Sequence, residues 1–321
     1  AGGAAGGAAG GAAGAAAEAT ASPGPGAALQ PTAGGVPWQP RVYVVTATGA
    51  GRMDLALSIQ QRMAEWLGPQ DVLSHVCEEG CLQTMGGGNL SNVFEVPNSP
   101  DGHYQLDTCK TETKKKCYPL RVSQIKFVYG LVREVRRLKA SGGAMPRWWL
   151  VKDDDTYVNM ANLVEAMERR AAGVLPQPPW RANVSFASTG CAPQVCGGAG
   201  WVLSAELAER LCLGPLGDAW IHEEMNMIVH PRRAAWYDQW LRFILRFMMT
   251  VPPEKYATVI RLEEMNEFAP GSDGCTHKRP EWTTCYDLGK VCRCSRALKP
   301  ATFHLKGDWR KELDVIIGAG L

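Results

Sequence analysis

Residues 147–162 read Arg-Trp-Trp-Leu-Val-Lys-Asp-Asp-Asp-Thr-Tyr-Val-Asn-Met-Ala-Asn, an apolar run followed closely by three consecutive aspartates. The apolar run predicts a buried strand. In an α/β sheet such a strand carries the residues that follow it to its carboxyl end, where these folds bind their ligands. Asp153, Asp154 and Asp155 repel one another unless a cation lies among them, and a divalent ion with oxygen ligands meets that need. An acidic surface turn is the alternative, but the buried strand before the triplet favours a ligand site.

Strands and helices alternate on both sides of this junction, which predicts an α/β fold with a mostly parallel sheet. A β-branched run at 41–48 predicts a central strand, and apolar residues at helical spacing follow it at 53–66. The same spacing predicts helices at 122–138 and 160–171, before and after the aspartates. Residues 77–117 are polar and rich in Gly, Asn and Pro, and we expect irregular structure pinned by cysteines there.

Two segments further along the chain carry residues that suit a binding site. Residues 196–204, Cys-Gly-Gly-Ala-Gly-Trp-Val-Leu-Ser, let the backbone approach a ligand or make a tight bend. Their spacing is neither a dinucleotide fingerprint nor a P-loop. Residues 220–226, Trp-Ile-His-Glu-Glu-Met-Asn, bring Glu223 and Glu224 together, and either is a candidate general base. A helix amino terminus that attracts acidic residues is the alternative.

The cysteine content indicates an oxidising compartment, because the chain has eleven cysteines and a reduced cytosolic domain normally carries fewer. Many are close in sequence, as Cys77 and Cys81 are, which favours disulfides that staple loops. Zinc is disfavoured because no two CxxC-type pairs occur at the right separation. No apolar run reaches about 18 residues, so we expect a lumenal fragment whose membrane anchor lies upstream of the first residue, with a soluble protein as the alternative.

Composition and charge set the domain organisation and exclude one class of partner. Residues 1–38 are an Ala/Gly-rich segment that predicts a disordered linker. Residues 39–321 are enough for one large α/β domain with a sizeable core. A net charge of +2 without a basic stripe argues against nucleic acid as a partner.

Four segments, in this order along the chain, resemble the inverting β-1,3-glycosyltransferases that include the core 1 β-1,3-galactosyltransferases and the Fringe N-acetylglucosaminyltransferases. Residues 149–159 are similar to the family's strand and DxD element, and residues 197–204 to its GGAG-aromatic element. Residues 221–224 are similar to its acidic catalytic element, and residues 292–305 to the Cys-Cys-Ser and Ser-Phe-His ending of the core 1 branch. The order of the four makes the resemblance specific over residues 41–310.

The resemblance implies a GT-A fold in which residues 39–170 bind the nucleotide and residues 171–321 bind the acceptor. It implies a UDP-sugar donor, Mn²⁺ as the ion, and a glycan or glycoprotein acceptor that receives a hexose or N-acetylhexosamine, with galactose favoured, in β-1,3 linkage. The ion would neutralise the charge that develops on the departing UDP. The resemblance also implies the Golgi or ER lumen and a type II membrane anchor, and it leaves a homodimer open.

Metal and nucleotide roles follow from the same resemblance. Asp155 is the leading direct ligand of the ion, and Asp153 and Asp154 contact the ribose and ion-bound water. Asp153 is also counted among the metal ligands, and His304 completes the metal site.

Roles in transfer follow likewise. Glu224 is the preferred base and Glu223 its alternative, although the family usually has Asp at the place of Glu224. Gly197, Gly198 and Gly200 are expected to lie near the donor sugar and acceptor. Trp201 is expected to form an apolar platform for a sugar.

One stretch departs from the family, and two other functions stay open. Residues 231–290 do not resemble the family's usual segment after the catalytic acid, so the acceptor cannot be carried over. A non-catalytic lumenal glycan-binding protein with the same fold is the main alternative. The aspartate triplet and the glutamate pair favour the enzyme, because a lectin does not need a site for a metal diphosphate. A retaining transferase is the lesser alternative.

Overall fold

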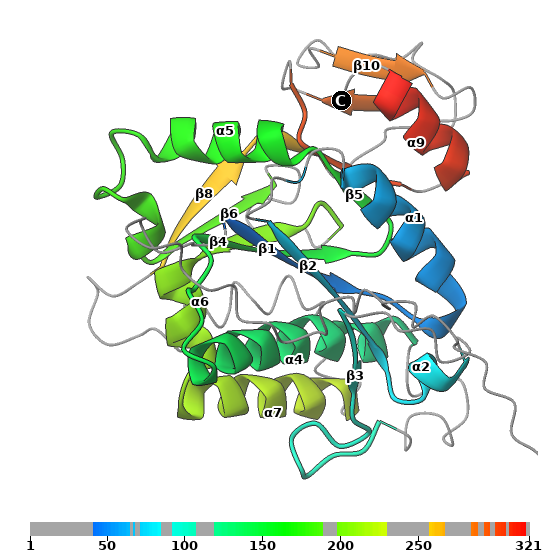
Figure 1. Cartoon of the computed structure of the whole chain (residues 1–321), viewed down its shortest axis with the longest axis vertical. Helices are drawn as coiled ribbons and strands as arrows, with labels where there is room; N and C mark the ends of the chain where they lie inside the picture. The colour runs from blue at the N-terminus through cyan, green and yellow to red at the C-terminus, as the bar shows by residue number, and fades with distance from the viewer. Residues whose placement is uncertain are drawn as a thin grey trace, which may run out of the picture.

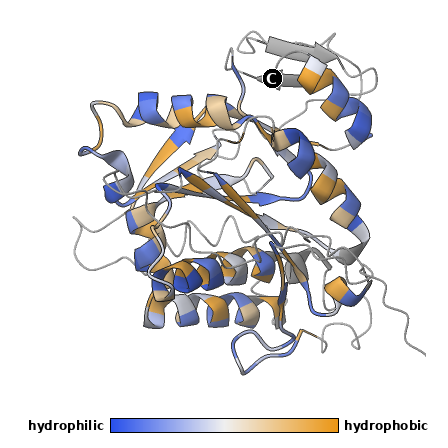
Figure 2. Cartoon of the chain, in the orientation of Figure 1, coloured by the Kyte–Doolittle hydropathy of each residue, from blue (hydrophilic) through white to orange (hydrophobic). Residues whose placement is uncertain are grey.

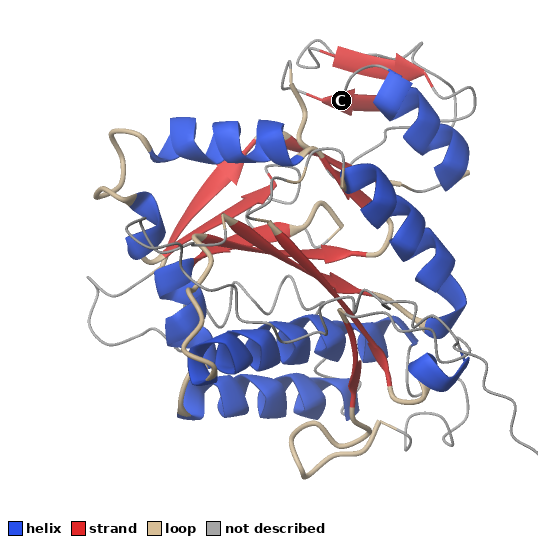
Figure 3. Cartoon of the chain, in the orientation of Figure 1, coloured by secondary structure: helices blue, strands red, loops and turns tan. Residues whose placement is uncertain are grey.

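The computed structural model describes residues 41–64, 67, 71–84, 92–106, 119–188, 198–229, 257–266, 284–287, 292–295, 299–305 and 308–318. A seven-stranded sheet forms the centre of the described part, with helices on both of its faces (Figure 1 and Figure 3). In spatial order its strands are β3 (Val93–Val96), β2 (Val72–Glu78), β1 (Val42–Ala47), β4 (Trp148–Asp153), β7 (Trp201–Ser204), β6 (Val184–Ser188) and β8 (Thr258–Leu262).

The strand directions and the strand order define a point of reversal in this sheet. Strands β3, β2, β1 and β4 are parallel to one another, β7 runs antiparallel between β4 and β6, and β8 is parallel to β6. From β1 the chain moves outward through β2 and β3 and then returns to β4 on the other side of β1. The carboxyl ends of β1 and β4 therefore meet where the strand order reverses, which is where open α/β sheets bind ligands. The predicted fold class, α/β with a mostly parallel sheet flanked by helices, is confirmed.

Helices cover both faces of the sheet, and the alternation of side chains along β1 shows how. Tyr43 and Val45 belong to one buried cluster, which contains the apolar sides of α4 (Pro119–Ala140), α6 (Ala205–Cys212) and α7 (Pro215–Val229). Val42 and Val44 belong to the opposite cluster, with α1 (Met53–Met63), α5 (Met160–Ala171) and α9 (Trp309–Gly318). In Figure 2 these helices carry hydrophobic and hydrophilic residues together, as helices that cover a sheet do.

The remaining elements are short. A three-stranded sheet joins β5 (Thr156–Val158), β12 (Thr302–His304) and β9 (Met265–Asn266), and β10 (Thr284–Asp287) pairs with β11 (Cys292–Ser295). The other short elements are η1 (Ala50–Arg52), α2 (Cys81–Thr84) and η2 (Pro179–Arg181). None of the helices in the described part of the chain has the length and apolar character needed to span a membrane.

The secondary structure confirms most of the predicted elements and corrects one segment. The strand at β1 and the helices α1, α4 and α5 are confirmed. The prediction of irregular structure over residues 77–117 is wrong in part, because that stretch contains α2 and β3. Strand β3 extends the sheet by pairing with β2, and long-range pairing of this kind leaves little trace in a segment of four residues.

The predicted disulfides are confirmed at one pair. Cys77 and Cys81 form a disulfide, and Cys212 is a free, buried cysteine in α6. The side chains of the other cysteines, and the predicted linker at 1–38, lie outside what the structure describes.

A buried histidine on β2 makes stability depend on pH. His75 is 2% exposed, and its Nε2 contacts Gln60 Oε1 on α1. Burial, together with the charge of Lys152, lowers the pKa of His75 to about 4. In the unfolded chain the histidine has a pKa of about 6.5, so between pH 6.5 and pH 4 it binds a proton that His75 in the folded protein does not bind. The contribution of His75 to stability is therefore complete above pH 6.5 and is lost as the pH falls toward 4.

We expect the wild-type protein to lose roughly 2 kcal/mol more of its free energy of unfolding between pH 7 and pH 4.5 than the variant His75→Gln does. Chemical denaturation of both proteins at the two pH values measures this difference. Equal losses in the two proteins would show that His75 does not resist protonation in the folded state.

Candidate functional site

Three side chains at the carboxyl end of β4 are placed to hold a metal ion. Ligand atoms of Asp153, Asp155 and His304 all lie within 4.8 Å of one another. Asp153 is the last residue of β4, and Asp155 lies in the turn that leads into β5. Strand β12 pairs antiparallel with β5, with His304 opposite Thr156, and this pairing returns the histidine to the aspartates. The predicted metal ligands are therefore brought together from positions 149 residues apart (304 − 155).

The contacts within this group fit a cation. His304 Nε2 lies 3.0 Å from Asp155 Oδ1, and the backbone N–H of Leu305 donates to the carbonyl of Asp155 at 2.7 Å. Asp155 Oδ1 is buried, and its close partner is the His304 imidazole, which carries a positive charge only when it is protonated. A buried carboxylate oxygen in this situation is costly unless a cation pairs with it. Two carboxylates and one imidazole suit a divalent metal ion.

Asp154 points to different partners. Its Oδ2 accepts a hydrogen bond from Thr48 Oγ1 at 3.1 Å, and its Oδ1 lies 2.9 Å from Arg52 Nη2. The same Arg52 nitrogen lies 2.9 Å from Asp155 Oδ2, so this guanidinium joins two of the three aspartates. The middle aspartate thus faces the end of β1, while its neighbours on either side face His304. The predicted contact of Asp154 with a ribose or an ion-bound water stays a prediction.

Arg52 is a site residue that the sequence analysis missed. It ends η1, directly after β1, and lies 103 residues before Asp155. A basic residue after the turn Thr48-Gly-Ala-Gly was the available signal, because the end of β1 meets the end of β4 in such a sheet.

The electrostatics of the triplet also favour a divalent ion. Burial, with the charges of Asp155 and Asp154, raises the pKa of Asp153 well above its usual range. Burial raises the pKa of Asp154 to about 6 against the opposing charge of Arg52. Burial also raises the pKa of Asp155, but the neighbouring His304 and Arg52 outweigh it and lower the pKa to about 2. A cation that replaces the bound protons relieves this crowding of carboxylates.

A buried lysine, Lys152, directly precedes the three aspartates in sequence and contacts the backbone of the first. Lys152 is 2% exposed on β4, and its Nζ donates to the carbonyl oxygen of Asp153 at 3.0 Å. Burial lowers the pKa of Lys152 to about 8, against the opposing charges of the three aspartates. The ammonium group partly balances the aspartates from inside the sheet.

The glycine-rich segment packs against β4 and β5. Gly198 accepts a hydrogen bond from Thr156 Oγ1 at 2.7 Å, and Gly200 has φ +77°. A Cβ at Gly200 would lie 3.1 Å from the carbonyl oxygen of Val151 and 3.2 Å from Leu150 Cδ1. Glycine at 200 therefore lets β7 begin directly against β4. The predicted nearness of these glycines to a donor sugar stays a prediction, and Gly197 lies outside the described residues.

The variant Gly200→Ala should lose about 2 kcal/mol or more of its free energy of unfolding, because alanine meets both an unfavourable φ and the strand backbone. Gly142→Ala is the matched control, since Gly142 has φ +66° but nothing within 4 Å of its added Cβ. We expect the control to lose only about 1 kcal/mol. Urea denaturation measures both losses, and equal losses would show that the close approach at Gly200 costs nothing.

Trp201 does not occupy the predicted place. Its side chain is 0% exposed, and its ring centroid lies 6.4 Å from that of Trp220 on α7. The indole is thus part of the core between the sheet and α7 and offers no surface to a sugar. An aromatic residue after a glycine turn fits both roles in the sequence, and burial favours the core role.

The two candidate bases differ in their surroundings. Both lie in α7, so the alternative of acids gathered at a helix amino terminus does not describe them, since the helix begins at Pro215. Glu224 is 0% exposed on the same face as Trp220 and Ile228, whereas Glu223 is partly exposed. The choice of base stays a prediction.

No protein-family model matches this sequence, and no curated protein does. Among solved structures, the chain is similar to a glycosyltransferase involved in the glycosylation of the major capsid of PBCV-1, with 10% identity and a TM-score of 0.35 over 70% of this chain and 82% of that chain. It is also similar to the apo form of mouse xyloside xylosyltransferase 1, with 12% identity and a TM-score of 0.32 over 68% of this chain and 84% of that chain.

Proposed function

We propose that this protein is a metal-dependent inverting glycosyltransferase. Its donor is a UDP-sugar, and its acceptor is a hydroxyl group of a glycan or glycoprotein. Transfer of galactose in β-1,3 linkage is the first reaction to test. The observation that carries the proposal is the group of Asp153, Asp155 and His304 at the carboxyl end of β4, beside the point where the strand order reverses.

The donor half of the site has the chemistry that a nucleotide diphosphate needs. Asp153, Asp155 and His304 would hold Mn²⁺, which when bound supplies a Lewis acid for the diphosphate of the leaving UDP. Asp154, fixed by Thr48 and Arg52, lies beside them and has a carboxylate that can accept hydrogen bonds from a ribose. The acidic triplet begins at the last residue of β4, at this edge of a mostly parallel sheet. The GT-A fold that the family resemblance implies has a strand followed by acidic residues in the same way.

The transfer step needs a base on the acceptor side. Glu224, whose buried carboxylate must become accessible when the acceptor binds, or Glu223 as the partly exposed alternative, would take the proton of the acceptor hydroxyl as its oxygen attacks the anomeric carbon of the sugar. The new bond forms on the face opposite UDP, the bond from the anomeric carbon to the phosphate oxygen breaks, and UDP keeps the electron pair. The configuration at the anomeric carbon is therefore inverted.

The competing proposal is a glycan-binding protein without catalysis. The group of Asp153, Asp155 and His304 favours the transferase over this alternative, because recognition of a glycan does not require carboxylates crowded at a sheet edge. A ligand that binds only the folded protein raises its melting temperature, and this separates the two functions. A transferase should show such a rise when Mn²⁺ and UDP are added together, and a lectin should not.

The cellular location is proposed on separate grounds. The Cys77–Cys81 disulfide supports an oxidising compartment, and we propose the lumen of the Golgi or ER. A homodimer stays a proposal as well.

One screen tests the function directly. The protein is incubated with a series of UDP-sugars and Mn²⁺, with and without a chelator, and release of UDP is measured. We expect chelator-sensitive release from one UDP-sugar, and a β-linked product from its α-configured donor by NMR when an acceptor is supplied. Absence of both UDP release and Mn²⁺-dependent UDP binding would overturn the proposal, and a product that retains the α configuration would overturn inversion.

A further inference from the structure

A second buried lysine, on α4, reaches the end of β1. Lys126 is 7% exposed, and its Nζ donates to the carbonyl oxygen of Thr48 at 2.6 Å and to Glu78 Oε2 at 2.5 Å. Burying an ammonium group costs several kcal/mol unless it is well paired, and an apolar side chain usually fills such a place at least as well. The position therefore calls for a reason other than stability.

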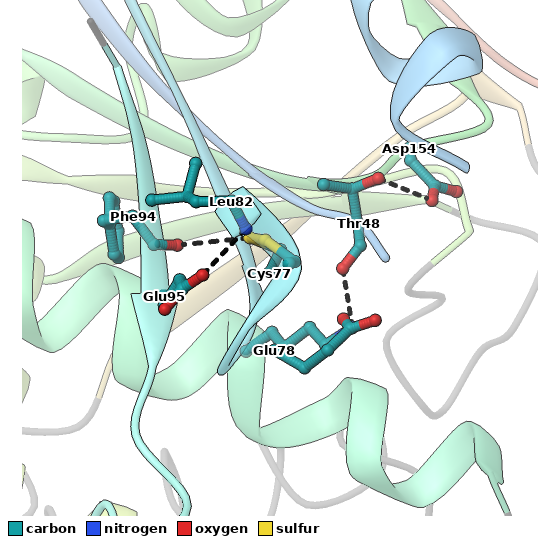
Figure 4. The surroundings of a disulfide bond; sticks show 9 residues. Thr48, Cys77, Glu78, Leu82, Phe94, Glu95 and Asp154 are labelled. Carbon is teal, nitrogen blue, oxygen red and sulfur yellow. Dashed lines mark hydrogen bonds and ion pairs between the residues drawn. A yellow bond between two sulfur atoms is a disulfide. The ribbon is translucent and has the colours of Figure 1, made fainter. Parts of the chain in front are cut away.

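Thr48 connects this lysine to the aspartates. Its backbone N–H donates to the carbonyl of Val76 on β2 at 2.8 Å, and its carbonyl accepts from Lys126. Its hydroxyl donates to Asp154 Oδ2 at 3.1 Å, as Figure 4 shows. The N–H and the C=O of Thr48 are both held, so its backbone is fixed at the place from which its hydroxyl reaches the carboxylate of Asp154.

The partner of the lysine is itself held in place. Glu78 is the last residue of β2 and lies between the two cysteines of the Cys77–Cys81 disulfide in sequence. The turn after it is tied to β3, since the backbone N–H of Leu82 donates to Glu95 Oε1 at 2.8 Å (Figure 4). The disulfide and this hydrogen bond fix the place from which Glu78 meets Lys126.

We propose that Lys126 is a positioning residue of the donor site. It holds Thr48, Thr48 holds Asp154, and Asp154 is thereby kept apart from the ion ligands Asp153 and Asp155 and directed toward the nucleotide. This inference rests on the proposed function, because it assigns Lys126 a part in binding the donor. Residues that orient a metal site from outside its ligands typically change affinity or activity 10- to 100-fold when altered.

The test compares two lysines of the same helix. Lys126→Met removes the charge and keeps the length of the side chain. Lys139→Met is the matched control, because Lys139 is exposed and pairs at 2.6 Å with Glu209, away from the aspartates. Calorimetric titration with UDP in the presence of Mn²⁺ should show binding weakened about tenfold or more by Lys126→Met and less than about twofold by Lys139→Met.

A double variant separates positioning from a merely structural role. Thr48→Val removes the hydroxyl that reaches Asp154 and should weaken UDP binding about as much as Lys126→Met does. Because both changes act through Asp154, the double variant should be no weaker than the worse single variant by more than about twofold. If the losses of UDP affinity in the two single variants multiply in the double variant, the inference is overturned. Wild-type UDP affinity in Lys126→Met would overturn it as well. If Lys126→Met does not fold, wild-type affinity in Thr48→Val overturns it.

The failure of this inference is distinguishable from failure of the proposed function. If the wild-type protein binds no UDP with Mn²⁺, the function fails, and the crystal structure of metal-free Lys126→Met then decides the inference. We expect the Asp154 carboxylate to leave Thr48 Oγ1 in that structure. An unchanged hydrogen bond would overturn the positioning role.

Discussion

Replacing Asp155 by Asn abolishes Mn²⁺-dependent binding of UDP, with affinity reduced by at least about 100-fold. Asparagine keeps the shape of the side chain but removes the charge that faces His304 on one side and Arg52 on the other. Loss of a carboxylate that would contact the ion directly should reduce affinity by more than the 10- to 100-fold that is typical when a residue orienting the ligands is altered. Titration calorimetry with UDP, with and without Mn²⁺, measures the loss.

The control for this change is Asp314→Asn. Asp314 lies on α9, its side chain is 68% exposed, and it pairs with Arg62 at 3.6 Å. This variant should keep wild-type affinity. In Asp155→Asn, the melting temperature should no longer rise when Mn²⁺ and UDP are added together, because no bound state remains to stabilise the fold. If Asp155→Asn binds UDP in the presence of Mn²⁺ with wild-type affinity, Asp155 is not a ligand of the ion.

Glu224→Gln reduces turnover by roughly 10²–10⁴ while donor affinity stays within about twofold, because a positioned base contributes that much to a transfer step. Glutamine keeps the size of a side chain that is 0% exposed beside Trp220, so the packing of α7 is preserved. Turnover with the donor identified by the screen and UDP affinity by calorimetry are measured on the same preparation.

The neighbouring residue supplies the comparison for this prediction. Glu223→Gln changes a partly exposed carboxylate one position away and should reduce turnover by less than about tenfold. A large loss in Glu223→Gln with little loss in Glu224→Gln would exchange the two roles. Full turnover in both variants would show that the base lies elsewhere.

The part of the site that is local in sequence was predictable. The buried run of β4 and the three aspartates that end it are adjacent residues, so hydrophobic pattern and charge together indicate a ligand site at a strand end. His304 was expected only through the family resemblance. Its approach depends on the pairing of β12 with β5, which no local pattern in either strand specifies.

The missed features share a dependence on long-range pairing. Polar Ser74 and His75 interrupt the apolar pattern of β2, although both are buried in the folded protein, where they lie opposite Val45 and Thr46 of β1. Arg52 and Lys126 meet the end of the sheet from elements distant in sequence, so neither stands out before the strand order is known. Trp201 shows the converse, since its sequence context suits both a sugar platform and a core residue.

A crystal of the wild-type protein soaked with Mn²⁺ and UDP, with data collected at the manganese absorption edge, tests the proposed donor site most directly. We predict one anomalous peak among Asp153, Asp155 and His304, in contact with the diphosphate of UDP. Absence of a peak there, or UDP bound at another edge of the sheet, would contradict the metal-dependent transfer proposed for this protein.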